Sequence, residues 1–360
     1  MKIAQVAPLY EAVPPRLYGG TERVVAHLTD ALVELGHEVT LFASADADTR
    51  AALVPVRDQA IRLDPAPLKS DLAAHLAMLA EVRRRADDFD VIHFHTDMLH
   101  FPMFEDLAER TITTLHGRLD LKDLPAVYRR WPAYPLVSIS DDQRRPLPFA
   151  NWVGTVHHGF PPEHYVFHPQ GRGYLAFLGR ISPEKRPDRA IEIARRCGKR
   201  LKIAAKIDAA DRPYWAEVIE PMIRREPLVE FVGEIGDADK SAFLGGADAL
   251  LFPIDWPEPF GLVMIEAMAC GAPVIAFGCG SVPEVVEPGV TGFIVEDVEG
   301  AAAAVGRLGE LHRPTVRARF EARFSAQAMA RRYLGLYASL GRPSTGPTPR
   351  RSADLTAVAA

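Results

Sequence analysis

The feature that most constrains the fold of this chain is a regular alternation between short apolar runs and amphipathic stretches. Residues 2–8 form an apolar run typical of a buried strand, and residues 38–43 form another. Between them, apolar residues recur at helical spacing over residues 22–35, and Gly36 follows where glycine commonly ends a helix. Two strands joined through a helix run parallel, so this stretch predicts a β-α-β unit.

The alternation continues along the chain and predicts two doubly wound α/β domains. In the first part, strands are expected at 91–95, 111–115 and 136–139, and a helix at about 70–86. In the second part, strands are expected at 174–178, 201–205, 229–232, 249–253 and 273–277, and helices at 187–197 and 261–269. We therefore place one domain at 1–165 and a second at 166–325, which suits 360 residues at about 150 per domain. Residues 326–340 have a helical pattern, and residues 341–360, rich in Pro, Ser, Thr and Gly, predict a disordered tail.

Composition excludes several classes of protein. Apolar residues make up 48% and charged residues 25%, a globular mix rather than a disordered, collagen-like or coiled-coil one. The net charge of −5 provides no general basic field, so we expect no nucleic-acid partner. Three cysteines are too few for a disulfide framework, which favours a reducing compartment. We find neither a membrane-spanning stretch nor a signal-peptide pattern after Met1, and expect a cytoplasmic location.

The segment from Pro257 to Phe277 carries the strongest chemical signal. Glu258 lies in a loop before a helix that opens at about Gly261, and the free amides of such a helix end bind anions or hydroxyls. Glu266, about one and a half turns into the helix, can accept hydrogen bonds from both hydroxyls of a ribose. The alternative is a capped helix with two solvated carboxylates. Because Glu266 lies among apolar residues, we expect it to have a partner if it is buried.

Two further segments suggest a site for phosphate. Arg180 follows a predicted strand and Lys185 follows a turn, so both are expected at a carboxyl strand end, where a guanidinium and an ammonium suit a diphosphate. The alternative is a solvated charged turn. Gly19 and Gly20 precede the first helix and let the backbone approach a ligand closely, although Thr21 is also a plain N-cap. Neither this pair nor the later glycines complete the dinucleotide fingerprint, which disfavours a nicotinamide dehydrogenase.

Taken together, these segments resemble the retaining glycosyltransferases of family 4. The resemblance lies in Gly19-Gly20, GRISPEKRP (179–187), EFVG (230–233), EPFGLVMIEAMACGAPVIA (258–276) and GSVPEVVEPGVTGFIV (280–295). It covers roughly residues 1 to 340 and is most specific in the second half, where Glu258 and Glu266 fill the Glu-x7-Glu motif of the family. It implies the GT-B fold, in which two Rossmann-like domains face each other across a cleft, with the helix at 326–340 crossing back to the first domain.

The resemblance also implies a role for each matching residue. Arg180 and Lys185 would bind the donor diphosphate and stabilise it as it leaves, and Glu258 would hold hydroxyls of the transferred sugar. Backbone amides of Phe260, Gly261 and Leu262 would contact sugar and phosphate, Glu266 the nucleotide ribose, and Gly19 and Gly20 the diphosphate from the other domain. His116 matches a family histidine near the reacting sugar, although from the residues alone a capping or core histidine is preferred. Lys206 stands where many members have a glycine-rich turn, and is either a phosphate contact or solvated.

The implied reaction moves a sugar from a nucleotide-diphosphate sugar, expected to be UDP-linked, to an unidentified acceptor. No carboxylate suggests itself as a nucleophile, which favours the front-face route in which the leaving phosphate takes the acceptor proton. No metal or other cofactor is expected. The pairs at 46–48 and 237–239 (Asp-Ala-Asp) are interpreted as turn and cap residues. The run from His93 to His100 leaves a metal site open, although polar residues lining the cleft are the preferred interpretation.

Other functions remain open on the same scaffold. A sugar-nucleotide epimerase or a hydrolase would need no acceptor, and a non-catalytic sugar-nucleotide-binding protein would bind the donor without turnover. The acceptor is a small molecule, a glycan or a lipid-linked group. The aromatic and basic cluster at 128–131 allows at most peripheral contact with a membrane.

Overall fold

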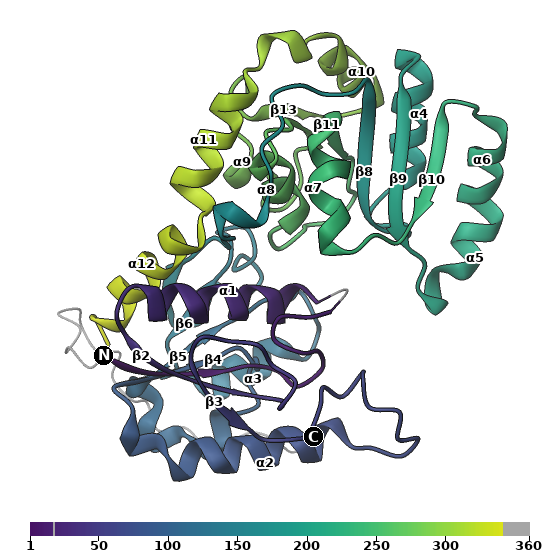
Figure 1. Cartoon of the computed structure of the whole chain (residues 1–360). Helices are drawn as coiled ribbons and strands as arrows, with labels where there is room; N and C mark the ends of the chain where they lie inside the picture. The colour runs from purple at the N-terminus through teal and green to yellow at the C-terminus, as the bar shows by residue number, and fades with distance from the viewer. Residues whose placement is uncertain (17–18, 341–360) are drawn as a thin grey trace.

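A computed structural model describes residues 1–16 and 19–340 of the protein and shows two parallel β-sheets, each with helices on both faces (Figure 1). The first sheet has the order β3-β2-β1-β4-β5-β6-β7. Its strands are β1 (Lys2–Val6), β2 (Glu38–Ala43), β3 (Ala52–Pro55), β4 (Val91–Phe94), β5 (Thr111–Thr114), β6 (Leu136–Ser138) and β7 (Trp152–Thr155). The predicted doubly wound architecture is therefore confirmed for this half.

Alternate residues of the first sheet pack against helices on opposite faces. Ile3 lies in a core with α1 (Gly20–Glu34) and α12 (Ala326–Tyr337), whereas Ala4 lies in a core with α2 (Asp71–Arg84). The short α3 (Leu124–Arg130) also packs on the α2 side. This period of two explains why the strands are apolar throughout, because both faces are covered.

The second sheet has the order β10-β9-β8-β11-β12-β13. Its strands are β8 (Tyr174–Arg180), β9 (Arg200–Lys206), β10 (Val229–Gly233), β11 (Ala247–Phe252), β12 (Val274–Phe277) and β13 (Gly292–Val295). One core holds residues of α7 (Asp237–Gly245), α8 (Leu262–Ala269), α9 (Val282–Val285) and α11 (Arg313–Phe324). The opposite core holds residues of α4 (Pro187–Cys197) and α10 (Val298–Gly306), with α5 (Arg212–Tyr214) and α6 (Glu220–Arg225) beside them.

The last two helices connect the two halves. In Figure 1, α11 runs along the second sheet and α12, in yellow, returns to the first, where it packs against α1. The hydroxyl of Ser325 caps α12 by accepting a hydrogen bond from the backbone N–H of Ala328 at 3.2 Å. Tyr333 and Tyr337 of α12 are buried in the first sheet's core. The predicted tail at 341–360 lies outside the described residues.

The structure adds elements that the sequence patterns did not indicate. Three strands were missed, β3, β7 and β13, and each has only four residues at or near a sheet edge. A four-residue strand gives too few positions for a periodicity to be recognised. Within the described residues, no helix combines the length and apolar composition that crossing a bilayer requires.

Candidate active site

The residues singled out from the sequence lie at the carboxyl ends of both sheets. Arg180 is the last residue of β8 and Lys206 the last of β9, while His116 follows β5. Gly20 opens α1 after β1, and the Glu258 loop lies between β11 and α8. In doubly wound folds this edge of the sheet is where ligands bind.

The two carboxyl edges touch each other. A Cβ atom added to Gly20 would lie 3.4 Å from Cδ1 of Leu262, so the first turns of α1 and α8 meet. The hydroxyl of Ser140 donates to the carbonyl of Pro259 at 2.6 Å, and Arg23 of α1 forms an ion pair with Asp237 of α7. The site is therefore assembled from both domains.

Glu258 is held by a lysine from another loop. Lys185 forms an ion pair with Oε2 of Glu258, and the side chains are only 17% and 13% exposed. The ring of Trp256 lies 5.0 Å from the Lys185 ammonium, which adds a cation–π contact. Gly280 has φ +59, and a Cβ there would lie 2.4 Å from the backbone nitrogen of Glu258. A glycine at this position thus lets two motif loops pack backbone to backbone.

The N-terminus of α8 is open, as expected from the sequence. Gly261 is its N-cap, with φ 77 and no side-chain capping bond. A Cβ at Gly261 would come within 2.9 Å of both Met264 and Phe252, so glycine is required there by conformation and by space. Phe260 is 2% exposed, and its carbonyl accepts a hydrogen bond from the Ser281 hydroxyl at 2.7 Å. The Glu258–Leu262 loop is thereby fixed, and no side chain caps the amide end of α8 among the described residues.

Glu266 is buried, and it has the hydrogen-bond partners that a carboxylate in apolar surroundings needs. Its Oε1 accepts from the Tyr165 hydroxyl at 2.9 Å and from the Lys240 ammonium at 2.8 Å. Among the described residues, Oε2 has no hydrogen-bond partner. Burial lowers the pKa of Lys240, but Glu266 and Asp237 outweigh it and leave the pKa above its usual value. Burial, reinforced by Glu266, raises the pKa of Tyr165 well above its usual value.

Arg180 lies among carboxylates. Its guanidinium is 2.8 Å from Glu184, 3.6 Å from Asp208 and 3.8 Å from Asp211. Lys206 pairs with Asp208 at 3.0 Å. The two cations at the ends of β8 and β9 therefore share Asp208 as an acidic neighbour.

His116 lies beside the Glu258 loop. Its Nε2 is 2.9 Å from Nδ1 of His95, and its ring stacks on His158 with centroids 5.3 Å apart. His158 in turn contacts the ring of Phe260 at 4.9 Å. Burial lowers the pKa of His116 to about 3, so the imidazole is neutral at physiological pH.

The histidine run and the two Asp-Ala-Asp pairs have other roles. His93 binds Tyr337 and Thr114, each at 2.7 Å, rather than facing a common centre with its neighbours. Over residues 1–16 and 19–340, no three His, Cys, Asp or Glu side chains are grouped so that they could hold a metal ion. Asp46 accepts from the backbone of Ala60, as a turn residue does. The interpretation of Asp237 as a turn residue was incomplete, because it opens α7 and also pairs with Arg23 and Lys240.

Sequence reasoning missed the residues that complete the site. Lys240, Tyr165 and Arg23 were not singled out, although the apolar surroundings of Glu266 indicated that a partner was needed. Lys240 and Tyr165 lie 26 and 101 residues from Glu266 in the sequence, and no local pattern identifies them as its partners.

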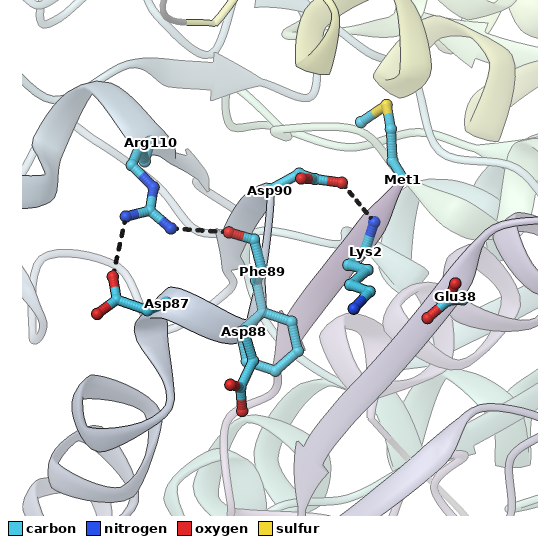
Figure 2. Close-up of a pocket in the computed structure, with 8 residues that line it drawn as sticks. All are labelled: Met1, Lys2, Glu38, Asp87, Asp88, Phe89, Asp90 and Arg110. Carbon is cyan, nitrogen blue, oxygen red and sulfur yellow. Dashed lines mark hydrogen bonds and ion pairs between the residues drawn. The ribbon is translucent and has the colours of Figure 1, made fainter.

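Two cavities lie near the ends of the first sheet. The larger, of about 760 Å³, lies at the amino ends of β1 and β4, away from the site, and is lined by Lys2, Arg110 and four carboxylates (Figure 2). The smaller, of about 190 Å³, lies between the domains and is lined by Arg118, Asp120, Gln143, Pro257 and others. The smaller cavity adjoins the Glu258 loop, so it extends the site toward the first domain.

Comparisons with known proteins agree with this geometry. The profile of Glycosyltransferase Family 4 matches residues 18–145, and that of Glycosyl transferases group 1 matches residues 166–323. The phosphatidyl-myo-inositol mannosyltransferase of Mycolicibacterium smegmatis is 26% identical, over 90% of this chain and 88% of that protein. AviGT4, a glycosyltransferase involved in avilamycin A biosynthesis, is 26% identical with a TM-score of 0.72, over 94% of this chain and 97% of that one. HepE of Anabaena, solved with UDP and glucose, shares the fold at 19% identity and a TM-score of 0.72, over 94% and 100% of the two chains.

Proposed function

From the premise that this chain belongs to glycosyltransferase family 4 and is a transferase with the GT-B fold, we propose that it is a retaining enzyme that uses a nucleotide-diphosphate sugar without a metal ion. The observation that carries the proposal is the state of the two motif carboxylates. Each is held through one oxygen by a lysine, Glu258 by Lys185 and Glu266 by Lys240. Among the described residues, the other oxygen of each has no partner. Two fixed carboxylates with one open oxygen each suit the hydroxyls of a sugar and of a ribose.

The diphosphate side of the proposed site combines cations with a helix end. The planar guanidinium of Arg180 can donate two parallel hydrogen bonds to a phosphate, and the ammonium of Lys185 adds a compact positive charge. The N-terminus of α8 supplies backbone N–H groups. These groups stabilise the charge that develops on the departing diphosphate, which is the role a metal ion plays in other phosphate chemistry. This arrangement supports metal independence.

The proposed route is front-face transfer with retention. The motif carboxylate nearest the transferred sugar, Glu258, is already in an ion pair with Lys185 and serves to bind hydroxyls rather than to attack. In the proposed step, the bond from the anomeric carbon to the diphosphate oxygen breaks and the acceptor oxygen bonds to the same face. The acceptor proton passes to the leaving phosphate. The cavity of about 190 Å³ beside Glu258 is the proposed entrance for the acceptor.

The donor base is tested by thermal unfolding with a panel of UDP, GDP, ADP, dTDP and NAD in the presence of a chelator. We expect UDP to raise the Tm, because HepE, which has this fold, was solved with UDP. A nucleotide at about 100 times its Kd adds roughly 2.7 kcal/mol, which is a shift of a few degrees. Glu266→Gln should reduce the shift, whereas Glu287→Gln, in an ion pair with Arg323 away from the site, should retain it.

The outcomes of this panel separate the possibilities. Stabilisation by a diphosphate other than UDP corrects the base and leaves the transferase site in place. Stabilisation by NAD alone, or by none of the five, contradicts the donor site. Once a donor is known, the anomeric configuration of the product by NMR tests retention, and release of the diphosphate only with an acceptor separates transfer from hydrolysis.

A further inference from the structure

A continuous chain of buried polar side chains runs behind His116. Gln5 of β1 and His95 after β4 are 0% and 3% exposed, and they connect His116 to Tyr337 of α12. Nε2 of His95 lies 2.8 Å from Oε1 of Gln5, and Nδ1 of His95 lies 2.9 Å from Nε2 of His116. Burying so many polar atoms is costly unless each bond has a donor and an acceptor.

This requirement gives the chain a direction. The amide oxygen of Gln5 can only accept, so Nε2 of His95 carries the hydrogen. A neutral imidazole has one N–H, so Nδ1 of His95 is the acceptor and Nε2 of His116 is the donor. Burial lowers the pKa of His95 well below its usual value and that of His116 to about 3, so both rings are neutral. The remaining nitrogen, Nδ1 of His116, is left with a lone pair.

The far end of the chain is compatible with this orientation of the Gln5 amide, because the Tyr337 hydroxyl can accept from the amide nitrogen and donate to His93. The amide nitrogen donates to the Tyr337 hydroxyl at 3.2 Å, and that hydroxyl lies 2.7 Å from Nδ1 of His93. Nε2 of His93 lies 2.7 Å from the Thr114 hydroxyl. Turning the amide over would reverse every bond in the chain and place the hydrogen of His116 on Nδ1.

The open nitrogen of His116 is buried at the edge of the proposed site. Among the described residues, Nδ1 of His116 has no hydrogen-bond partner, a state that it shares with Nδ1 of His100 and of His158. The amide of Gln143 donates to the carbonyls of Leu115 and Gly117, each at 2.8 Å, and so fixes the backbone on both sides of His116. The ring itself is stacked on His158 beside the Glu258 loop. An acceptor atom held so firmly and left unpaired is prepared for a donor group that arrives with the substrate.

We infer that Gln5 and His95 are positioning residues that hold His116 as the Nε2–H tautomer, so that its Nδ1 accepts a hydrogen bond from a hydroxyl of the transferred sugar. The inference rests on the proposed function for the identity of that hydroxyl, but the tautomer itself is a property of the protein without ligand. It also makes α12 a support of the transfer site, through Tyr337.

The test is histidine ¹⁵N NMR of the full chain without ligand, in which a bare nitrogen and an N–H nitrogen have distinct shifts. The His116→Gln variant assigns the resonances. We expect Nε2–H at His116 in the wild type, a changed tautomer population in His95→Leu, and the wild-type state in His95→Gln, whose amide again offers one donor and one acceptor. His100→Leu is the matched control, because His100 is equally buried and bonds to Thr113 but lies outside the chain of bonds.

A kinetic measurement separates positioning from a general loss of structure. With UDP-glucose as donor probe and UDP release, by transfer of the sugar to an added acceptor or to water, as the signal, His95→Leu should lower kcat at least about tenfold while the Kd for UDP changes less than about twofold. His95→Gln should recover most of kcat, and His100→Leu should lower the Tm but not kcat. A wild-type His116 with the hydrogen on Nδ1, or a tautomer that His95→Leu leaves unchanged, overturns the inference. Absence of UDP release with the expected tautomer would instead count against the proposed donor.

Discussion

Acid should destabilise this protein strongly, because several buried histidines are neutral in the folded chain. Besides His75 and His116, they include His27, His93, His95, His100 and His158, all less than 8% exposed. Burial lowers the pKa of His27 to about 3 and that of the other four well below the usual value. The unfolded chain, whose histidines have a pKa near 6.5, therefore binds protons that the folded chain does not.

The sign and size of the effect follow from these shifts. A depressed folded-state pKa contributes stability that is complete above about pH 6.5 and is lost as the pH falls toward about 3. Between pH 7.5 and 5.5, each such histidine costs about 1.4 kcal/mol of the free energy of unfolding, so five cost about 7 kcal/mol. Asp97, whose pKa burial raises to about 6, offsets a small part of this loss, because its folded form binds a proton more readily than its unfolded form. Since domains are typically stable by about 5–15 kcal/mol, the protein should lose a large part of its stability between pH 7.5 and 5.5.

The assay is urea unfolding, followed by circular dichroism at pH 7.5, 6.5 and 5.5. His27→Phe removes one titrating group from a site already lined by the rings of Phe160 and His164. It should reduce the total loss by about 1.4 kcal/mol. The control is His312→Gln, at an exposed histidine, which should leave the pH dependence unchanged. A free energy of unfolding that is constant from pH 7.5 to 5.5 would refute the reasoning.

Three further predictions concern the site. Arg180→Ala and Lys185→Ala should each lower kcat/KM by about tenfold to a hundredfold, because each removes a charged contact to the leaving diphosphate, and unchanged kinetics in both would contradict the assignment. Lys240→Met should cost about 3–5 kcal/mol in urea unfolding by leaving a buried carboxylate unpaired, and a second substitution of that carboxylate by Met should recover most of the loss. Gly280→Ala should abolish UDP-induced stabilisation, since its Cβ would collide with the backbone of Glu258, whereas an unaltered thermal shift would show that the loop can move.

The parts of the fold that the sequence predicted are those set by local periodicity. The strand at 38–43 and the helix at 187–197 occur with those bounds, because each is long enough for its apolar pattern to repeat. The helix start at Gly261 was also predictable, since a loop motif precedes a long apolar stretch there. The family followed from short motifs whose spacing is local as well.

The partners within the site could not be predicted in this way. The apolar neighbours of Glu266 indicated that its carboxylate would need a partner if it was buried. Nothing near Glu266 in the sequence, however, identified Lys240 or Tyr165 as that partner. The metal alternative for the run beginning at His93 stayed open for the same reason, because the hydrogen bonds of that run reach across the sheet to β1, β5 and α12.

The sequence by itself thus determined the two doubly wound domains, the family and the residues at the carboxyl strand ends, because each depends on residues a few positions apart. Only the tertiary structure decided which oxygen of Glu258 and Glu266 is engaged, and which nitrogen of His116 is left open. These choices depend on contacts such as that between Gln5 and Tyr337, which are 332 residues apart. Such contacts are important because burying a polar atom without a hydrogen bond costs free energy, and only the tertiary structure determines which partner lies within reach.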